Sequence, residues 1–478
     1  MELTDLSATE LAKGFRAKEF SAVEATKACL ARIEKENPKL NAFLEVFDDA
    51  EKTAAEADRA LAREGERAHA LCGVPIAVKD NILIKGEIAS AASKILSTHR
   101  ATYDATAIAK LKAAGAVFLG RTNMDEFAMG SSTEHSAFGP SRNPFDTSRV
   151  PGGSSGGSSA AVAAHLAPIA LGSETCGSIR QPASLCGLVG LKPTYGAVSR
   201  SGLIAMGSSL DQIGPFGRVV EDVETVFNTI RGHDPLDGTT LPDAGETLAR
   251  NKKIGVPRDF VKDAAPDAQN LFEQRLADLG GKGYEIVDIE FPSAPFALAA
   301  YYIVMPAEVS TNLARFDGMR YGLSYAGKDL LEEYEKSRAH GFGAETRRRV
   351  ILGAYVLSSG YYDAYYRRAT ALRDVIAEDL TKAFQNVSYI ATPTTPGPAF
   401  KIGEKSDPVS MYLEDIFAAP ANLTGIPAIT VPAGMAERDG VSLPVGVQFM
   451  SPKRTEASLF AIARDALNEP FAPPVSSL

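Results

Sequence analysis

Apolar positions in the first 65 residues recur at helical spacing behind two helix-start signals. Ser7 pairs with Glu10, and Ser21 with Glu24, in capping boxes where a hydroxyl and a carboxylate satisfy each other's backbone donors. After Ser21 the apolar side chains return every three or four residues, at Ala22, Ala25, Cys29, Leu30 and Ile33. This pattern predicts an amphipathic helix ending near Pro38, within a helical N-terminal segment over residues 1–65.

Between residues 66 and 235 short apolar runs alternate with helical stretches. The runs at 74–79, 116–119 and 169–171 predict buried strands, the first ending at Lys79 and the second closed by Gly120. A further short apolar element covers 187–191, and the helical stretches cover 105–115 and 160–164. Alternation of this kind is typical of an α/β sheet.

From residue 255 the pattern is mainly helical, with predicted helices at 266–280, 328–338, 344–360 and 362–386. Strand patterns return at 387–391, 428–431 and 445–449, before a last helix over 456–467. Apolar strands therefore lie on both sides of the helical stretch. We predict a single α/β domain in which a helical insertion over 255–386 interrupts one sheet, to which the chain returns over 387–478.

Composition and charge exclude several classes of protein. The net charge is −9, and the densest basic cluster is Arg347 to Arg349. Binding a phosphate backbone requires several clustered cations, so we expect no strong nucleic-acid binding by this chain alone, which leaves open a partner that carries RNA.

The acidic start, Met1 to Asp5, is unlike a secretory or mitochondrial leader, and no apolar run is long enough to cross a membrane. The four cysteines form no CxxC pair, which predicts no zinc site and a cytoplasmic protein.

A glycine- and serine-rich run covers residues 151–159, in the order PGGSSGGSS. Its composition suits a flexible linker, and it lacks the Gly-Lys-Ser/Thr ending of a phosphate-binding loop. The apolar stretch 160–164 follows at once, however, which places the glycines at the start of a buried helix. A helix N-terminus offers unpaired amides and a favourable field for negative charge.

A serine and a lysine are candidates for nucleophilic chemistry. Ser178 follows a Thr-Cys-Gly turn after a predicted strand, and amides of such a turn can converge on one oxygen, although an ordinary turn fits equally well. The six histidines match no triad pattern. Lys79 is the alternative base, because partial desolvation at the end of its strand would lower its pKa. It would also suit a plain strand cap, and spacing alone does not connect it to Ser178.

Together these segments resemble the amidase signature family, over essentially the whole chain. The resemblance is carried by GVPIAVKDN at 73–81, GGSSGG at 152–157 and SIRQP at 178–182. It implies a mixed central β-sheet covered by helices and a serine amide hydrolase. By the same resemblance Ser178 is the nucleophile, Lys79 the base and Ser154 the bridging serine, after a cis Gly153–Ser154 peptide. Protons would pass from Ser178 to Ser154 to Lys79, and the relay would reverse to protonate the departing ammonia.

The implied oxyanion donors are the backbone amides of Thr175, Cys176 and Gly177. The family usually has Asp-Thr-Gly-Gly-Ser here, whereas this chain has Glu174-Thr-Cys-Gly-Ser178. If the position of Cys176 requires a positive φ, its side chain strains the turn. A catalytically inactive scaffold is therefore one alternative.

Within the family, segments outside the core resemble the A-type subunits of glutamyl-tRNA(Gln)/aspartyl-tRNA(Asn) amidotransferases: KPTYG at 192–196, SLDQIGP at 209–215, RFDG at 315–318, LSSGYYDAYY at 357–366 and MYLEDIF at 411–417. This implies a subunit that hydrolyses glutamine and passes ammonia to a partner for protein biosynthesis. The expected assembly has two further subunits, of B and C type, with tRNA, ATP and Mg²⁺ bound by the partner and no cofactor in this chain. The alternative is a stand-alone amidase for small or aryl amides.

For glutamine itself the resemblance implies a pair of opposite charges. Arg348 would hold the α-carboxylate and Asp415 the ammonium, with Tyr301 assisting. Because Arg348 stands between two other arginines, the register can be off by one. Arg348 would also suit a solvated helix face, and Asp415 would suit an ordinary helix carboxylate.

Overall fold

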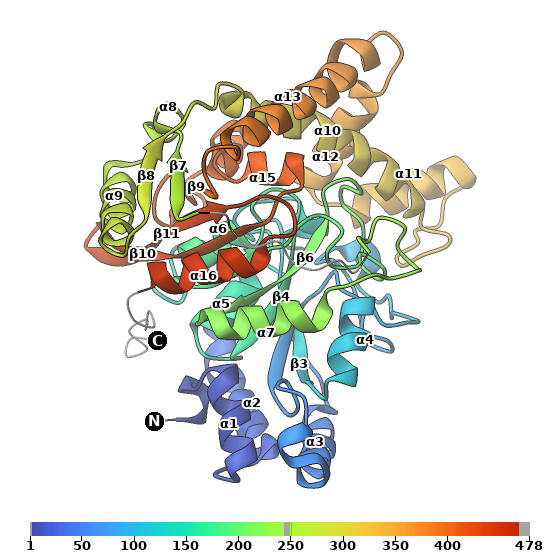
Figure 1. Cartoon of the computed structure of the whole chain (residues 1–478). Coiled ribbons are helices and arrows are strands. Elements are labelled where there is room, and N and C mark those ends of the chain that lie inside the picture. Colours follow the sequence, from blue (N-terminus) through green and yellow to red (C-terminus); the bar gives the residue numbers. More distant parts are fainter. Residues whose placement is uncertain (1, 243–248, 250, 468–478) are drawn as a thin grey trace.

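A mixed sheet of eleven strands runs through the molecule and is surrounded by helices (Figure 1). The computed structural model describes residues 2–242, 249 and 251–467. The strand order is β1-β3-β2-β4-β6-β5-β10-β11-β9-β7-β8. The strands are β1 Phe43–Val46, β2 Pro75–Lys79, β3 Val117–Thr122, β4 Ile169–Glu174, β5 Val189–Lys192, β6 Gln212–Gly217, β7 Lys253–Val256, β8 Glu285–Asp288, β9 Tyr389–Pro393, β10 Ala428–Arg438 and β11 Val441–Met450.

Two parallel groups of strands are joined through antiparallel ones. Strand β2 runs parallel to β3 and β4, and β7 runs parallel to β8 and β9. The other pairs are antiparallel, including the long β10–β11 hairpin. All five residues of β2 are buried and both of its edges are paired, so the side chain of its last residue, Lys79, lies in the interior.

Both predicted capping boxes are present, at the starts of α1 and α2. None of the helices among the described residues is long and apolar enough to cross a membrane. The helices are α1 Ala8–Ala17, α2 Ala22–Leu40, α3 Ala50–Glu64, α4 Thr106–Ala113, α5 Gly156–Ala163, α6 Arg180–Leu185, α7 Val220–Ile230, α8 Arg258–Val261, α9 Pro266–Gly281, α10 Ala297–Asn312, α11 Leu330–Gly341, α12 Ala344–Val356, α13 Arg367–Ala383, α14 Pro408–Tyr412, α15 Ala419–Thr424 and α16 Glu456–Ala466.

The segment 255–386, predicted as a helical insertion, is not wholly helical. Strand β7 extends into it and β8 lies inside it, and β7 pairs with β9 to extend the sheet. β8 has no fully buried residue, so its sequence lacks the apolar run that marks an interior strand. The part from α10 to α13 is helical, and these helices project from one end of the sheet (Figure 1). We refer to α10–α13 as the helical arm.

Several predicted boundaries are wrong by a few residues. Helix α2 continues through Pro38 to Leu40 and stops at Asn41, which has a left-handed conformation. Strand β3 continues through Gly120 to Thr122, because Gly120 fits directly against the backbone of β1, where a Cβ would lie 2.1 Å from the Glu45 carbonyl oxygen. Helix α12 ends at Val356 and not at 360, before the π-helical turn Tyr362–Tyr366.

Candidate active site

Lys79 enters the interior at the end of β2 and meets two serines of the glycine-rich run. Its side chain is fully buried. Its Nζ donates hydrogen bonds to Ser154 Oγ at 2.8 Å, to Ser155 Oγ at 2.7 Å and to the Ser173 carbonyl at 3.1 Å. The lysine is thus held between the glycine-rich run and the end of β4.

Burial lowers the pKa of Lys79 to about 7, against the opposing charges of Asp125, Asp211 and Glu174. An ammonium that leaves water loses its solvation, and three carboxylates return only part of that stabilisation. Near pH 7 a large share of Lys79 is therefore a neutral amine. Its lone pair can then accept a proton from the Ser154 hydroxyl, which is what a general base requires.

The glycine-rich run is a fixed bend and not a flexible linker. The Gly153–Ser154 peptide is cis, and helix α5 begins at Gly156. All residues from 150 to 164 are buried. The glycines are required by close packing, since a Cβ on Gly157 would lie 2.4 Å from the Asn123 carbonyl oxygen. The run is therefore a structural part of the site, at the start of a buried helix.

The turn after β4 presents Ser178 beside three free amides. Gly177 has φ +93°, whereas Cys176 is not in the left-handed region, so the conformation that favours glycine falls on Gly177 and Cys176 adds no strain of that kind. Within the described part of the chain, the N–H groups of Thr175, Cys176 and Gly177 donate no hydrogen bond. They remain available to an anionic oxygen near Ser178.

A buried ion pair fixes this turn. Glu174 Oε2 accepts hydrogen bonds from the amides of Ile179 (3.0 Å) and Arg180 (3.1 Å), and its Oε1 accepts from Arg180 Nη2 at 2.5 Å. Burial raises the pKa of Glu174, but the charge and hydrogen bonds of Arg180, together with the charge of Lys192, hold this pKa below its usual value.

The Arg180 guanidinium also connects distant segments. It donates to the Ala418 carbonyl at 2.9 Å, and to side-chain oxygens of Asn422 and Gln448. The turn that carries Ser178 is therefore tied to α15 and β11. The sequence pattern did not identify this role for Arg180, because its partners lie more than 230 residues away along the chain.

The two serines of the implied relay lie on segments that meet at Gln181. The Gly153 amide donates to Gln181 Oε1 at 2.9 Å, and Gln181 lies three residues after Ser178, in α6. Ser178 is 4% exposed, and its hydroxyl has no hydrogen bond to any described residue. The contact from Lys79 to Ser154 is thus formed, while the step from Ser154 to Ser178 is not a hydrogen bond in this structure. The roles of the three residues stay predictions.

Asp415 lies beside the Ser178 turn and carries an unsatisfied oxygen. Its Oδ2 accepts from Ser131 Oγ at 2.5 Å, while its buried Oδ1 has no partner among the described residues. A Cβ on Gly177 would lie 2.9 Å from that Oδ1. Burial raises the pKa of Asp415 well above its usual value. A cationic group placed next to this oxygen would reverse the shift.

The two tyrosines at 301 and 302 lie on α10 near the same turn. The hydroxyls of Tyr301 and Thr175 are 2.8 Å apart. The Tyr302 ring stacks on Tyr412, with the ring centroids 3.9 Å apart.

The structure buries a different arginine from the predicted one. The Arg348 side chain is 49% exposed on the outer side of α12 and pairs with the buried Glu345. Arg349 is 3% exposed, pairs with Glu345 at 2.8 Å, and lies 5.4 Å from the centroid of the Tyr302 ring. One residue is about 100° of rotation on a helix, so identical neighbours face different ways. Arg349, and not Arg348, faces the tyrosines.

Two further residues of the site were missed from the sequence. Ser155 contacts Lys79 as closely as Ser154 does, and the only signal was its position in the glycine-rich run. Ser131, which holds Asp415, lies in a loop with no motif.

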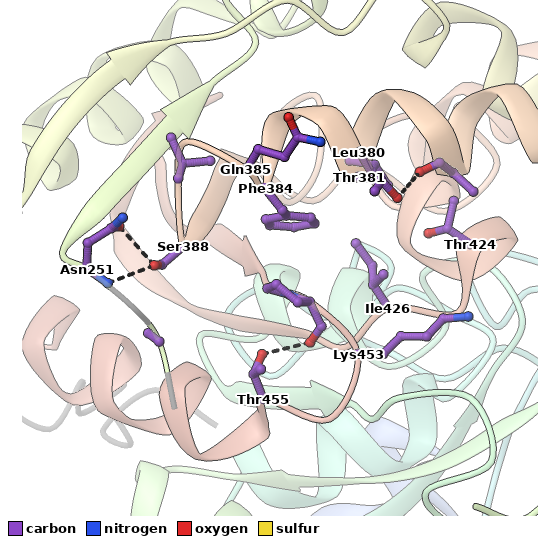
Figure 2. Close-up of a pocket in the computed structure, with 14 residues that line it drawn as sticks. Asn251, Leu380, Thr381, Phe384, Gln385, Ser388, Thr424, Ile426, Lys453 and Thr455 are labelled. Atoms are coloured by element: carbon purple, nitrogen blue, oxygen red, sulfur yellow. Dashed lines mark hydrogen bonds between the residues drawn. The ribbon is translucent and has the colours of Figure 1, made fainter. Parts of the chain in front are cut away.

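A separate cavity of about 540 Å³ lies elsewhere, at the end of α13 (Figure 2). Phe384, Ile426 and Lys453 are among the residues that line it. None of the predicted site residues does.

Comparison with known proteins identifies the family. Residues 24–460 match the amidase family, and the chain belongs to that family. It is 51% identical to the A-type subunit of the glutamyl-tRNA(Gln) amidotransferase of Carboxydothermus hydrogenoformans, over 97% of each chain. It is 48% identical to the protein of that name from Paenarthrobacter aurescens, over 99% of this chain and 94% of the relative.

Solved structures give the same result. The A-type subunit of glutamyl-tRNA(Gln) amidotransferase from Thermotoga maritima superposes with a TM-score of 0.81 at 39% identity, covering 98% of this chain and 96% of the other. The peptide amidase of Stenotrophomonas maltophilia also gives 0.81, at 32% identity, covering 97% and 96%. The predicted family and its mixed α/β fold are confirmed.

Proposed function

We propose that this chain is the glutaminase subunit of a tRNA-dependent amidotransferase. The observation that carries the proposal is the fully buried Lys79, which donates to Ser154 beside the Ser178 turn. Similarity over nearly the whole chain to subunits of that enzyme, at 51% and 39% identity, supports glutamine as the substrate. The product would be ammonia, used by a partner to convert Glu-tRNA(Gln), Asp-tRNA(Asn) or both to the amidated forms.

The proposed reaction uses these groups in the order Ser178, Ser154 and Lys79. Ser178 Oγ attacks the side-chain amide carbon of glutamine, while its proton passes to Ser154 and the Ser154 proton passes to neutral Lys79. The amides of Thr175, Cys176 and Gly177 stabilise the resulting oxyanion. The C–N bond then breaks as the relay returns a proton to the nitrogen, which leaves as ammonia. Water hydrolyses the remaining ester to glutamate by the same relay.

Asp415 and Arg349 would hold the amino-acid end of glutamine. The free Oδ1 of Asp415 suits the α-ammonium, whose charge would lower the raised pKa of that carboxyl. Arg349 keeps donors beyond its pair with Glu345 and suits the α-carboxylate. Tyr301, which bonds to the turn through Thr175, would border the same space.

The remaining reaction belongs to the partners. We expect two further subunits, of B and C type, with ATP, Mg²⁺ and tRNA bound by the partner, in the cytoplasm. The net charge of −9 supports an arrangement in which tRNA is held mainly by another protein of the complex.

The nucleophile is tested with Ser178→Ala. The purified variant should fold as the wild type by circular dichroism and release no ammonia from glutamine above background, alone or with its partner subunits. Retained hydrolysis in this variant would refute the mechanism.

Recognition is tested with a matched pair of arginine variants. Arg349→Ala should raise the KM for glutamine at least about tenfold, because a charged contact to the carboxylate is lost. Arg348→Ala, its exposed neighbour, should leave KM within about twofold. The reverse result would return the role to Arg348.

Two alternatives have distinct outcomes. The equal TM-score to a peptide amidase favours, as second candidate, a stand-alone amidase. High turnover of aryl or peptide amides by the chain alone, with poor turnover of glutamine, would support it. A fluorophosphonate that labels neither the chain nor its complex would instead indicate an inactive scaffold.

A further inference from the structure

The tip of the helical arm exposes a group of large apolar and aromatic side chains. The group lies where the outer side of α12 meets the π-helical turn Tyr362–Tyr366. We call it the tyrosine patch; it consists of Ile351, Leu352, Tyr355, Tyr361, Tyr362 and Tyr365. Ile351 is 69% exposed, and the other five are 38–46% exposed. Clustered exposed apolar side chains of this kind mark binding surfaces.

The rings of the patch are ordered by one another. The centroid of the Tyr355 ring lies 4.3 Å from that of Tyr361 and 6.4 Å from that of Tyr365. The Tyr361 and Tyr365 centroids are 6.0 Å apart. Three rings thus form one surface cluster that is already arranged before any partner binds. Tyrosines that are held in place lose little side-chain entropy on binding.

The charges around the patch differ from those of the whole chain. Across residues 344–370 there is no lysine, and the single glutamate, Glu345, is buried. The exposed charges are four arginines, at 347, 348, 367 and 368, against Asp363. The chain as a whole has a net charge of −9. The centres of protein–protein interfaces are rich in tyrosine and arginine and poor in lysine and glutamate, and the patch has the same composition.

Helix α12 connects the patch to the active site. Its inner side carries Glu345 and Arg349, and its outer side carries Ile351, Leu352 and Tyr355. A protein that covers the patch therefore lies against the helix that would hold the glutamine carboxylate. Such a position suits a partner that must receive a small product from this site.

We propose that the tyrosine patch is the docking surface for the amidotransferase subunit that consumes the ammonia. The inference rests on the proposed function. The matching face of that subunit would be apolar, with carboxylates at its rim opposite the four arginines. A second copy of this chain fits less well, because two basic rims would face each other. Two of the four arginines are already paired with carboxylates, Arg348 with Glu345 and Arg367 with Asp363, and the chain has a net charge of −9, which argues against RNA as the occupant.

The test uses the full chain co-expressed with the two further subunits of the amidotransferase from the same source. Tyr355→Ala/Tyr361→Ala should weaken binding to these subunits at least about tenfold, measured by titration of the purified proteins. Leu330→Ala/Leu331→Ala is the matched control, because both leucines are 65% exposed on α11 of the same arm. The control should bind as the wild type.

A charge variant guards against local misfolding of the tip. Arg368→Glu changes one exposed side chain and should weaken binding about threefold or more, with a smaller effect at high salt. Both patch variants should keep the glutaminase activity of the isolated chain, since no patch residue belongs to the active site.

The outcomes separate the two proposals. If wild-type chain neither hydrolyses glutamine nor binds the subunits, the proposed function fails. If it does both and the patch variants bind like the control, only the docking surface is refuted. A third outcome would also refute the docking surface. The patch variants would still bind the two subunits but would lose self-association, or tRNA binding by the isolated chain.

Discussion

Two buried lysines, one on the third strand in the order of the sheet and one on its central strand, end strands in the same way but have different surroundings. Lys79 is the last residue of β2 and Lys192 the last of β5, and both are fully buried. Burial lowers the pKa of each to about 7. By burial and acidity alone, either would qualify as a general base.

Their hydrogen-bond partners distinguish them. Lys79 donates to the hydroxyls of Ser154 and Ser155, whereas Lys192 donates to the Pro193 carbonyl at 2.8 Å and to Gln212 Oε1 at 3.3 Å. A hydroxyl can give up and receive a proton, and a carbonyl oxygen has no proton to give. A perturbed lysine thus becomes a candidate base through the groups it contacts, and Lys192 has a structural role.

The largest expected effect separates the lysines by substitution. Lys79→Met should lower kcat/KM for glutamine at least about 10³-fold, because it removes the base from the relay. Lys192→Met should change kcat/KM by less than about tenfold. The rate of ammonia release under equal conditions measures both variants. Comparable losses of kcat/KM would mean that the hydrogen-bond partners do not distinguish the two lysines.

The pH dependence of the rate sharpens the comparison. Lys79 must be neutral to accept a proton, so kcat/KM should fall about tenfold per pH unit below about 7 and level off above it. Lys192→Met should keep the same profile. A profile that is flat through pH 7 in the wild type, or that moves with Lys192, would contradict the assignment.

Ser155 is expected to have an intermediate effect. Ser155→Ala removes one of the contacts that hold Lys79 and should lower kcat about 10- to 100-fold, with KM little changed. Ser154→Ala should cost more, because it breaks the relay itself. Equal losses of kcat in the two variants would indicate that the two hydroxyls have the same role.

The smallest effect is on stability. The unfolded chain protonates a lysine near pH 10.5, while the folded chain does so only near 7. Between these values the unfolded state binds more protons, so stability falls as the pH is lowered from about 10 to 7, by at most about 1.4 kcal/mol per unit for each lysine. Lys192→Met should weaken this slope in urea unfolding at pH 7 and 9. An unchanged slope would show that the pKa of Lys192 in the folded chain is not near 7.

The local signals in the sequence predicted local structure well. Both capping boxes formed, and the strand ending at Lys79 is β2. Strand β6 was missed because glycine and proline interrupt its apolar pattern, although pairing on both sides buries it. The β10–β11 hairpin was predicted too short, since prolines interrupt both strands and the left-handed Asp439-Gly440 turn was overlooked.

The site was predictable only where residue types differ. Lys79 and Ser178 stood out from their neighbours, and family resemblance supplied their connection. Arg349 did not, because three consecutive arginines look alike until the rotation of α12 is known. The unsatisfied Oδ1 of Asp415 and the bonds of Arg180 depend on contacts between distant segments, which no local pattern contains.

Arg180 also has a consequence for the order in which the protein is made. The ribosome has added Lys79, Ser154 and Ser178 well before half of the chain exists. The guanidinium that fixes the Ser178 turn, however, needs Ala418, Asn422 and Gln448. A nascent chain therefore carries Lys79, Ser154 and Ser178 before the contacts of Arg180 to α15 and β11 can form. These contacts are complete only when synthesis of the chain is almost finished.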